Sequence, residues 1–321
     1  MNYAAINLAA EMARQVWAMQ PDVLASLNAL ALDWSGAAAR PTHSARGFGA
    51  SPQTGRGIAV LRLFGPLSPR ADVFNMFCGG TALDAFRADL AAAVANETIG
   101  QILIECDSPG GSVYGCEETA RAIRQARQTK PVVAIANSTS ASAAYWLTSQ
   151  ADESFVTPGG EVGSVGVYGE HTDVSKAFAM AGRRVTVIGA GKYKTEGSPF
   201  APLDAEAKRF MQERVDSYYS DFVKDVALGR TVSVDQVRKS MGGGRMFGAD
   251  AALAAGMVDG VMTIDQVVQR MQRAARSARP GARAAAFTIA GTGSANELRM
   301  AQLAALELGL PDPTRHRTGA G

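Results

Sequence analysis

Short apolar runs alternate with amphipathic helical patterns along most of this chain, and this alternation constrains the fold more than any other feature. Each run has the length and apolar content of a buried strand. Strands that alternate with helices predict an α/β fold, in which crossover helices cover a largely parallel sheet. The predicted strands are GIAVLRLFG (57–65), QILIEC (101–106), PVVAIAN (131–137), ESFVTP (153–158) and RRVTVIG (183–189), and the predicted helices span 82–96, 117–128, 142–151 and 175–182.

Different patterns flank this region and indicate the domain organisation. Residues 4–31 carry apolar side chains near helical spacing, and Pro21 breaks or restarts the pattern. A loop rich in Gly, Ser, Pro and Arg follows. We expect an N-terminal helical arm and linker over 1–56, a compact domain over 57–275 with an accessory helix at about 203–228, and a flexible Ala/Arg/Gly-rich tail with one short helix over 276–321.

Composition narrows the classes of partner. Lys and Arg are spread along a chain of net charge +2, so nothing favours nucleic acid or an anionic membrane as a partner. The N-terminus lacks a basic region followed by an apolar core, and no apolar run approaches the length of a membrane span. We therefore expect a cytoplasmic protein without a membrane anchor. Its three cysteines, Cys78, Cys106 and Cys116, are expected to be reduced, and neither a metal nor an organic cofactor is implied.

The motif DSPGG, residues 107–111, follows a predicted strand at the sheet edge where α/β folds bind ligands. Adjacent glycines let the backbone approach a ligand closely and leave N–H groups free to bind a developing negative charge. Gly110 and Gly111 are therefore candidates for an oxyanion hole. The alternative is a strand-to-helix turn without a catalytic role.

A run of hydroxyl side chains, in ANSTSASAAYWLTSQA (136–151), follows the next predicted strand and so reaches the same edge. Residues 138–140 are plausible helix caps, which is the commonest reason for hydroxyls at such a place. Ser142 comes after them, inside the expected first turn, among small side chains that leave room for a substrate carbonyl. It is a candidate nucleophile, and the alternative is a tightly packed helix.

A serine nucleophile needs a general base, and the residues leave two choices open. His171, two positions before Asp173, permits a Ser/His/Asp arrangement, and its alternative is a polar loop before a helix that Asp173 caps. The other choice is a lysine of GAGKYKTEGSP (189–199). A lysine acts as a base only when burial or a nearby positive charge lowers its pKa, whereas most loop lysines are solvent-exposed.

Five motifs in this order resemble the S49 peptidases, the signal peptide peptidase A family and its relatives in head maturation of tailed phages. The resemblance covers about residues 57–272. Its specificity comes from the order of the motifs, because each is common singly. The motifs are ECDSPGGSV, NSTSASAAYW, GEVGSVGV, GAGKYKTEGSP and GRMFGADAALAAGMVDGV.

The resemblance implies a fold like that of Clp protease and crotonase, built of repeated β-β-α units, and a serine peptidase with a Ser/Lys dyad. The nucleophile falls on Ser142, the base on Lys194 and the serine that orients the lysine on Ser164. The oxyanion hole falls on Gly110 or Gly111 together with the N–H of Ala143. Lys192 and His171 stay as alternative bases. Ala143 and Ala144 stand where the family usually has glycines, which should narrow the substrate pocket.

The implied partners follow from the branch of the family. The amphipathic N-terminal pattern and the Ala-rich tail resemble the phage or prophage branch, which cleaves scaffold and capsid proteins inside an assembling head. We expect a protein or peptide substrate, a homo-oligomeric ring, and a location in the bacterial cytoplasm or the phage prohead. The alternatives are a soluble cellular peptidase of the signal-peptide-peptidase type, a crotonase-like acyl-CoA enzyme and a non-catalytic structural protein.

Overall fold

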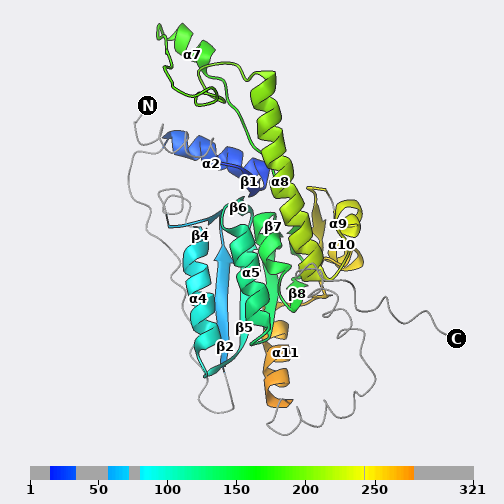
Figure 1. Cartoon of the computed structure of the whole chain (residues 1–321). Coiled ribbons are helices and arrows are strands. Elements are labelled where there is room, and N and C mark those ends of the chain that lie inside the picture. Colours follow the sequence, from blue (N-terminus) through cyan, green and yellow to red (C-terminus); the bar gives the residue numbers. More distant parts are fainter. Residues whose placement is uncertain (1–14, 34–56, 72–79, 242, 278–321) are drawn as a thin grey trace, which may run out of the picture. The chain divides into compact units, whose positions relative to one another are not determined.

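The protein is described by a computed structural model that covers residues 15–33, 57–71, 80–241 and 243–277 (Figure 1). The three long strands of its larger sheet run in parallel, in the order β2 (Gly57–Phe64), β5 (Ile99–Ser108), β7 (Val132–Ala141), with β2 at the edge of the sheet. The first half of β7 pairs with β8 (Glu153–Val156) and its last residues pair with β9 (Glu161–Gly163), both in parallel. Two short strands extend these branches: β11 (Gly260–Val261) runs parallel to β8, and β10 (Met246–Gly248) runs antiparallel to β9.

A smaller sheet lies at the end of the central strands and has the order β1-β6-β3-β4. Strand β6 (Gly110–Ser112) follows β5 directly and pairs in parallel with β3 (Leu67–Ser68). On its other edge β6 pairs antiparallel with β1 (Trp17–Met19). The last strand, β4 (Thr81–Ala82), runs parallel to β3.

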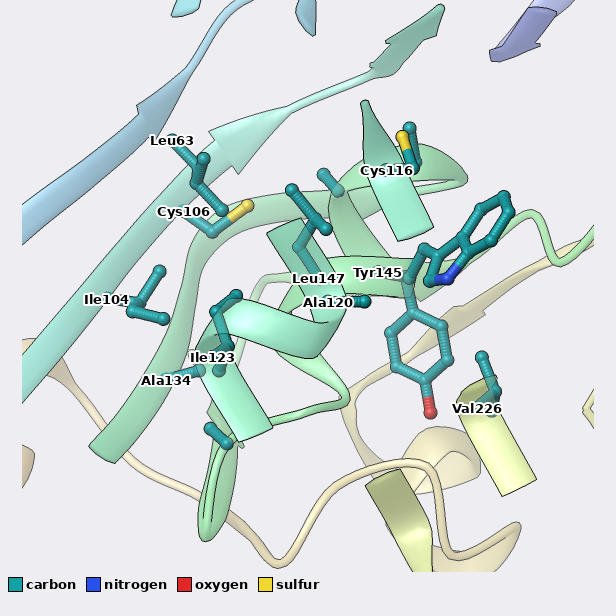
Figure 2. Packing of buried hydrophobic residues seen from close by; sticks show 14 of the residues in the cluster. Leu63, Ile104, Cys106, Cys116, Ala120, Ile123, Ala134, Tyr145, Leu147 and Val226 are labelled. Atoms are coloured by element: carbon teal, nitrogen blue, oxygen red, sulfur yellow. The ribbon is translucent and has the colours of Figure 1, made fainter. Parts of the chain in front are cut away.

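Helices cover the larger sheet on both faces. The main apolar core lies between the sheet and α4 (Leu83–Ala95), α5 (Cys116–Arg127), α6 (Ala143–Thr148) and α8 (Ala205–Arg230). Figure 2 shows Leu147 of α6 among Cys106, Ala120 and Ile123, while Tyr145 of the same helix points toward Val226 of α8. On the opposite face, Val267 and Met271 of α11 (Ile264–Ser277) pack on the strands. The remaining helices are α2 (Pro21–Asp33), α7 (Ser175–Met180), α9 (Val234–Ser240) and α10 (Ala249–Ala254).

The α/β fold with a mainly parallel sheet confirms the fold class predicted from the sequence. The strands predicted from 57, 101, 131 and 153 are present, and so are the helices between them. The accessory helix is confirmed as α8, which begins at a cap where the Asp204 side chain accepts the N–H of Ala207. Within the described ranges, no helix has both the length and the apolar character that a membrane crossing requires.

An ion pair fixes the C-terminal end of α8. The guanidinium of Arg230 donates two hydrogen bonds to Asp259, each 2.8 Å long, and Asp259 also accepts the N–H of Ser154 at 2.7 Å. Burial by itself would raise the pKa of the Asp259 carboxyl, but the hydrogen bond and charge of Arg230 hold this pKa below its ordinary value. The helix is thereby tied to the approach to β11.

Two of the predicted secondary-structure elements are wrong. Residues 17–19, predicted as part of a helical arm, form strand β1. The reason is that the backbone of β6 pairs with one edge of this segment and the backbone of Tyr168 pairs with the other. Residues 183–189, predicted as a strand, have no regular structure. They lie outside the sheets, and Val187 and Ile188 are 49% and 93% exposed, so no neighbouring strand satisfies their backbone groups. Residues 1–14 of the arm and 278–321 of the tail are outside the described residues.

Candidate active site

Ser142 occupies a strained turn between β7 and α6. Its φ of 55° and ψ of −118° lie outside the regions that non-glycine residues ordinarily adopt. The Ser142 N–H donates to the Gly163 carbonyl at 2.7 Å, and the hydroxyl donates to the Gly166 carbonyl at 3.3 Å. A serine forced into such a strand-to-helix turn has the backbone form of a nucleophile elbow.

The hydroxyl run before Ser142 has a different role from the one expected. Strand β7 continues through Ala141, because its last residues pair with β9. Ser138 to Ser140 are therefore strand residues and not helix caps, and Ser142 itself takes the N-cap position of α6 without a side-chain capping bond. The Ser140 hydroxyl is instead hydrogen-bonded to that of Thr148.

The glycines of DSPGG lie against this turn. A Cβ built on Gly110, whose φ is +94°, would be 3.0 Å from the Cβ of Ser142. The Gly110 N–H donates to the Ser108 hydroxyl oxygen at 3.2 Å, so this group is already used inside the motif. Gly111 lies opposite Ala18 in the ladder between β6 and β1. The two sequence motifs therefore meet at one place, and Gly111 is the better candidate for an oxyanion donor.

Ser164 lies on the other side of the nucleophile turn. It follows β9, has a φ of 54° and is 7% exposed, and its N–H donates to the Arg245 carbonyl at 2.8 Å. Its neighbours Gly163 and Gly166 accept the two hydrogen bonds of Ser142. The structure thus brings together Ser142, Ala143, the glycine pair and the GSVGV segment.

The candidate general bases do not lie at this turn. They lie in residues 170–204, the segment that precedes α8. This part carries α7 and projects beyond the N-terminal end of α8, away from the sheet (Figure 1). Lys194 is exposed, and in the described part of the chain its ammonium has no hydrogen-bonding or ionic partner. Within one chain the structure therefore does not bring Lys194 to Ser142.

The alternative bases have partners of their own. A ring nitrogen of His171 is 3.1 Å from the Ser198 carbonyl oxygen, and Asp173 accepts the Ser175 N–H just before α7. Lys192 donates to the Tyr193 hydroxyl at 2.6 Å and to Glu206 at 3.3 Å. These two contacts raise the pKa of Lys192, the reverse of what a general base requires.

A buried polar cluster anchors the helix that follows Ser142. The indole N–H of Trp146 donates to the Asp225 carboxylate at 2.7 Å, and Arg124 is paired with the same carboxylate at 2.8 Å. The ring of Trp146 stacks on Phe222 with centroids 4.6 Å apart. This cluster locks α6 to α5 and α8. The sequence indicated a packed Trp146, but nothing local pairs it with Asp225, 79 residues away.

Comparison with known proteins identifies related sequences. The model of peptidase family S49 matches residues 124–277. "Head-tail preconnector protein GP5" of Enterobacteria phage P21 is 34% identical over 221 residues, which are 69% of this chain and 44% of that protein. "Capsid assembly protease C" of Escherichia phage lambda is 31% identical over 224 residues, 70% of this chain and 51% of that protein.

A cellular relative is also similar: "Protease 4" of Salmonella typhi is 27% identical over 230 residues, 70% of this chain and 35% of that protein. This chain spans about half the length of the phage proteins that it matches. The order of the motifs, the α/β fold, the strained Ser142 beside Gly110 and these matches have one explanation. The chain belongs to peptidase family S49.

Proposed function

We propose that this protein is a serine endopeptidase that hydrolyses peptide bonds with a Ser142/Lys194 dyad, and that residues 57–275 are its peptidase domain. The observation that carries the proposal is the strained turn at Ser142, pressed against the glycine pair of β6. Backbone strain at a single buried serine, held by hydrogen bonds to Gly163 and Gly166, is characteristic of a positioned nucleophile.

The reaction follows from these positions. Neutral Lys194 takes the proton of the Ser142 hydroxyl while Oγ attacks the scissile carbonyl carbon, and Ser164 orients the amine. The N–H groups of Gly111 and Ala143 bind the oxyanion, with Gly110 shaping the turn beside them. When the tetrahedral intermediate collapses, the leaving amine takes the proton from Lys194. Neutral Lys194 then takes a proton from the water molecule that attacks the acyl-enzyme carbonyl, and it returns this proton to the Ser142 Oγ as the ester bond breaks and the acid product leaves.

Lys194 has to reach Ser142, and assembly into a homo-oligomeric ring offers a route. Most of the large exposed apolar side chains in the described residues lie near this lysine in the sequence. Large apolar side chains left exposed are typical of a protein interface. They are Met180, Val185, Val187, Ile188 and Tyr193 in the segment before α8, and Phe210 on α8.

Mixing of two inactive variants tests this assembly. Ser142→Ala and Lys194→Ala chains are each expected to be inactive, and co-assembled chains should regain activity if one copy supplies the lysine to another. Light scattering at micromolar concentration gives the mass of the assembly. A monomer at every concentration would refute the ring.

The substrate that we propose is a scaffold or capsid protein cleaved during phage or prophage head maturation, in the bacterial cytoplasm or inside the prohead. The names of the phage P21 and phage lambda relatives support this choice. A cellular peptidase of the signal-peptide-peptidase type is the alternative. Co-expression with a phage capsid and scaffold pair, followed by mass spectrometry of new termini, separates the two: processing of unfolded cellular peptides alone would favour the cellular role.

Labelling with a fluorophosphonate probe tests the chemistry. Ser142 should be labelled, and Ser142→Ala and Lys194→Ala should abolish labelling. Lys192→Ala and His171→Ala are the controls and should keep it. Loss of labelling in His171→Ala with retention in Lys194→Ala would assign the base to His171. An assembled protein without any labelling would exclude a serine peptidase, and acyl-CoA binding would then distinguish a crotonase-like enzyme from a structural protein.

A further inference from the structure

Strand β1 lies next to the turn that carries the candidate nucleophile. Ser142 is 0% exposed, which leaves no room for a substrate carbonyl. Strand β1 comes from the far N-terminal part of the sequence and is itself buried beside this turn, with Trp17 at 1%, Ala18 at 0% and Met19 at 2% exposure. A peptidase whose nucleophile is closed by its own chain must open before it can act.

Both edges of β1 are paired as those of a bound peptide would be. On one edge it runs antiparallel to β6, with Val113 N–H donating to Val16 at 3.2 Å and Gln20 N–H donating to Pro109 at 3.1 Å. On the other edge Trp17 and Tyr168 exchange two backbone hydrogen bonds of 2.9 Å. The strand is therefore held between β6, which carries the candidate oxyanion glycines, and the segment that follows Ser164.

The register places Ala18 at the reacting position. In an antiparallel ladder, hydrogen-bonded pairs alternate with non-bonded ones, so the bonded pairs at Val16/Val113 and Gln20/Pro109 make Ala18 and Gly111 the bonded pair between them. The Ala18 carbonyl oxygen and the Ser142 Cβ both lie within 3.0 Å of the point where a Gly110 Cβ would stand. The Ala18 carbonyl thus lies beside the serine and opposite the candidate oxyanion donor.

We propose that residues 16–20 form an internal competitor that fills the substrate cleft, and that this strand must leave before Ser142 can be acylated. The proposal rests on the peptidase function proposed above. It also defines the ligand: an extended peptide that adds a strand between β6 and Tyr168. The buried small side chain of Ala18 and the buried Val16 predict a small residue before the scissile bond and an apolar residue two positions earlier.

Exchange of β1 for a substrate is energetically feasible. A peptide in the cleft would make the same ladder hydrogen bonds, so only the side chains and the tether differ between the two occupants. The tether gives β1 a high effective concentration, which keeps the cleft closed until a substrate binds more tightly or assembly withdraws the strand.

A binding experiment tests occupancy without any need for catalysis. The full chain with Ser142→Ala is mixed with a fluorescent peptide of residues 14–22, RQVWAMQPD, with and without Ala18→Glu in the protein. A buried glutamate should expel β1, so the peptide should bind at least about tenfold more tightly to the Ala18→Glu chain. Val16→Asp is a milder second variant, and Ala252→Glu, at an equally buried alanine of α10, is the control.

The experiment distinguishes failure of the β1 proposal from failure of the proposed peptidase function. Equal peptide affinity with and without the β1 substitutions, in chains whose thermal melting shows that they are folded, would overturn the proposal. In chains with Ser142 intact, Ala18→Glu should raise the rate of fluorophosphonate labelling about tenfold. Peptide binding that follows the prediction without any labelling would leave β1 as the occupant of the cleft and reject the peptidase function. Labelling that β1 substitutions leave unchanged or slow would reject the competitor and retain the peptidase.

Discussion

Gly110→Ala is the most direct perturbation of the site. The added methyl group would lie 2.2 Å from the Ala18 carbonyl oxygen, 2.9 Å from that of Ala141 and 3.0 Å from the Ser142 Cβ. Two of these atoms are backbone and cannot rotate away. In addition, the φ of +94° at this position is unfavourable for any residue with a Cβ.

The two costs can be added for an expected magnitude. A left-handed conformation costs roughly 1–2 kcal/mol for a non-glycine residue, and overpacking against a rigid neighbour costs roughly 1–3 kcal/mol. Urea denaturation should therefore show Gly110→Ala to be destabilised by about 2–5 kcal/mol. Fluorophosphonate labelling of Ser142 should be lost as well, because the methyl group blocks the approach to its hydroxyl.

Alanine substitutions at two other glycines separate the conformational cost of Gly110→Ala from its packing cost. Gly256 has a φ of +72° but nothing within 4 Å of a Cβ, so Gly256→Ala should cost only the roughly 1–2 kcal/mol of the conformation. Gly159 has neither a positive φ nor a neighbour within 4 Å, and Gly159→Ala should be neutral within about 0.5 kcal/mol. If Gly110→Ala were no more destabilised than Gly256→Ala, the close packing of β1, β6 and the Ser142 turn would be refuted.

Three further predictions concern the surroundings of the site. Asp225→Ala should lose about 1–3 kcal/mol in urea denaturation, because it leaves the buried indole of Trp146 without its acceptor and removes the ionic partner of the partly buried Arg124. By contrast, Asp221→Ala in the same helix should stay within about 0.5 kcal/mol of the parent. The pKa of Asp259 is lower in the folded than in the unfolded protein, so its ion pair stabilises the fold above pH about 4, the pKa of an unfolded aspartate, and this contribution is lost as the pH falls further. Asp259→Asn should flatten that part of the curve of unfolding free energy against pH. An unchanged curve would contradict the pairing of Asp259 with Arg230. Burial raises the pKa of Cys106 to about 12 and raises that of Cys116 as well, so thiol reagents at pH 8 should modify both only after denaturant is added, which mass spectrometry of the peptides would reveal.

The local sequence pattern was sufficient to predict a helix or strand wherever burial of its own apolar face dominates its stability. The apolar strand residues of β5 and β7 and the amphipathic α5 and α8 were predicted within a few residues, because burial of an apolar face dominates their stability. Ser142 and the glycine pair could also be named as candidates, since a serine peptidase requires those residue types in that order. The family resemblance, and with it the Lys194 assignment as a proposal, followed from the same ordered motifs.

Other features were decided only by tertiary structure, because they depend on which backbone groups meet. Trp17–Met19 became a strand since β6 and Tyr168 offer a hydrogen-bonding edge on each side, whereas residues 183–189, with a stronger strand pattern, found none. The strain at Ser142 arises where β7 ends against β9 and Gly110, a junction of three segments distant in sequence. The sequence by itself determined which residues could do chemistry in this protein, and the packing of distant segments decided which of them meet and which strand lies beside them.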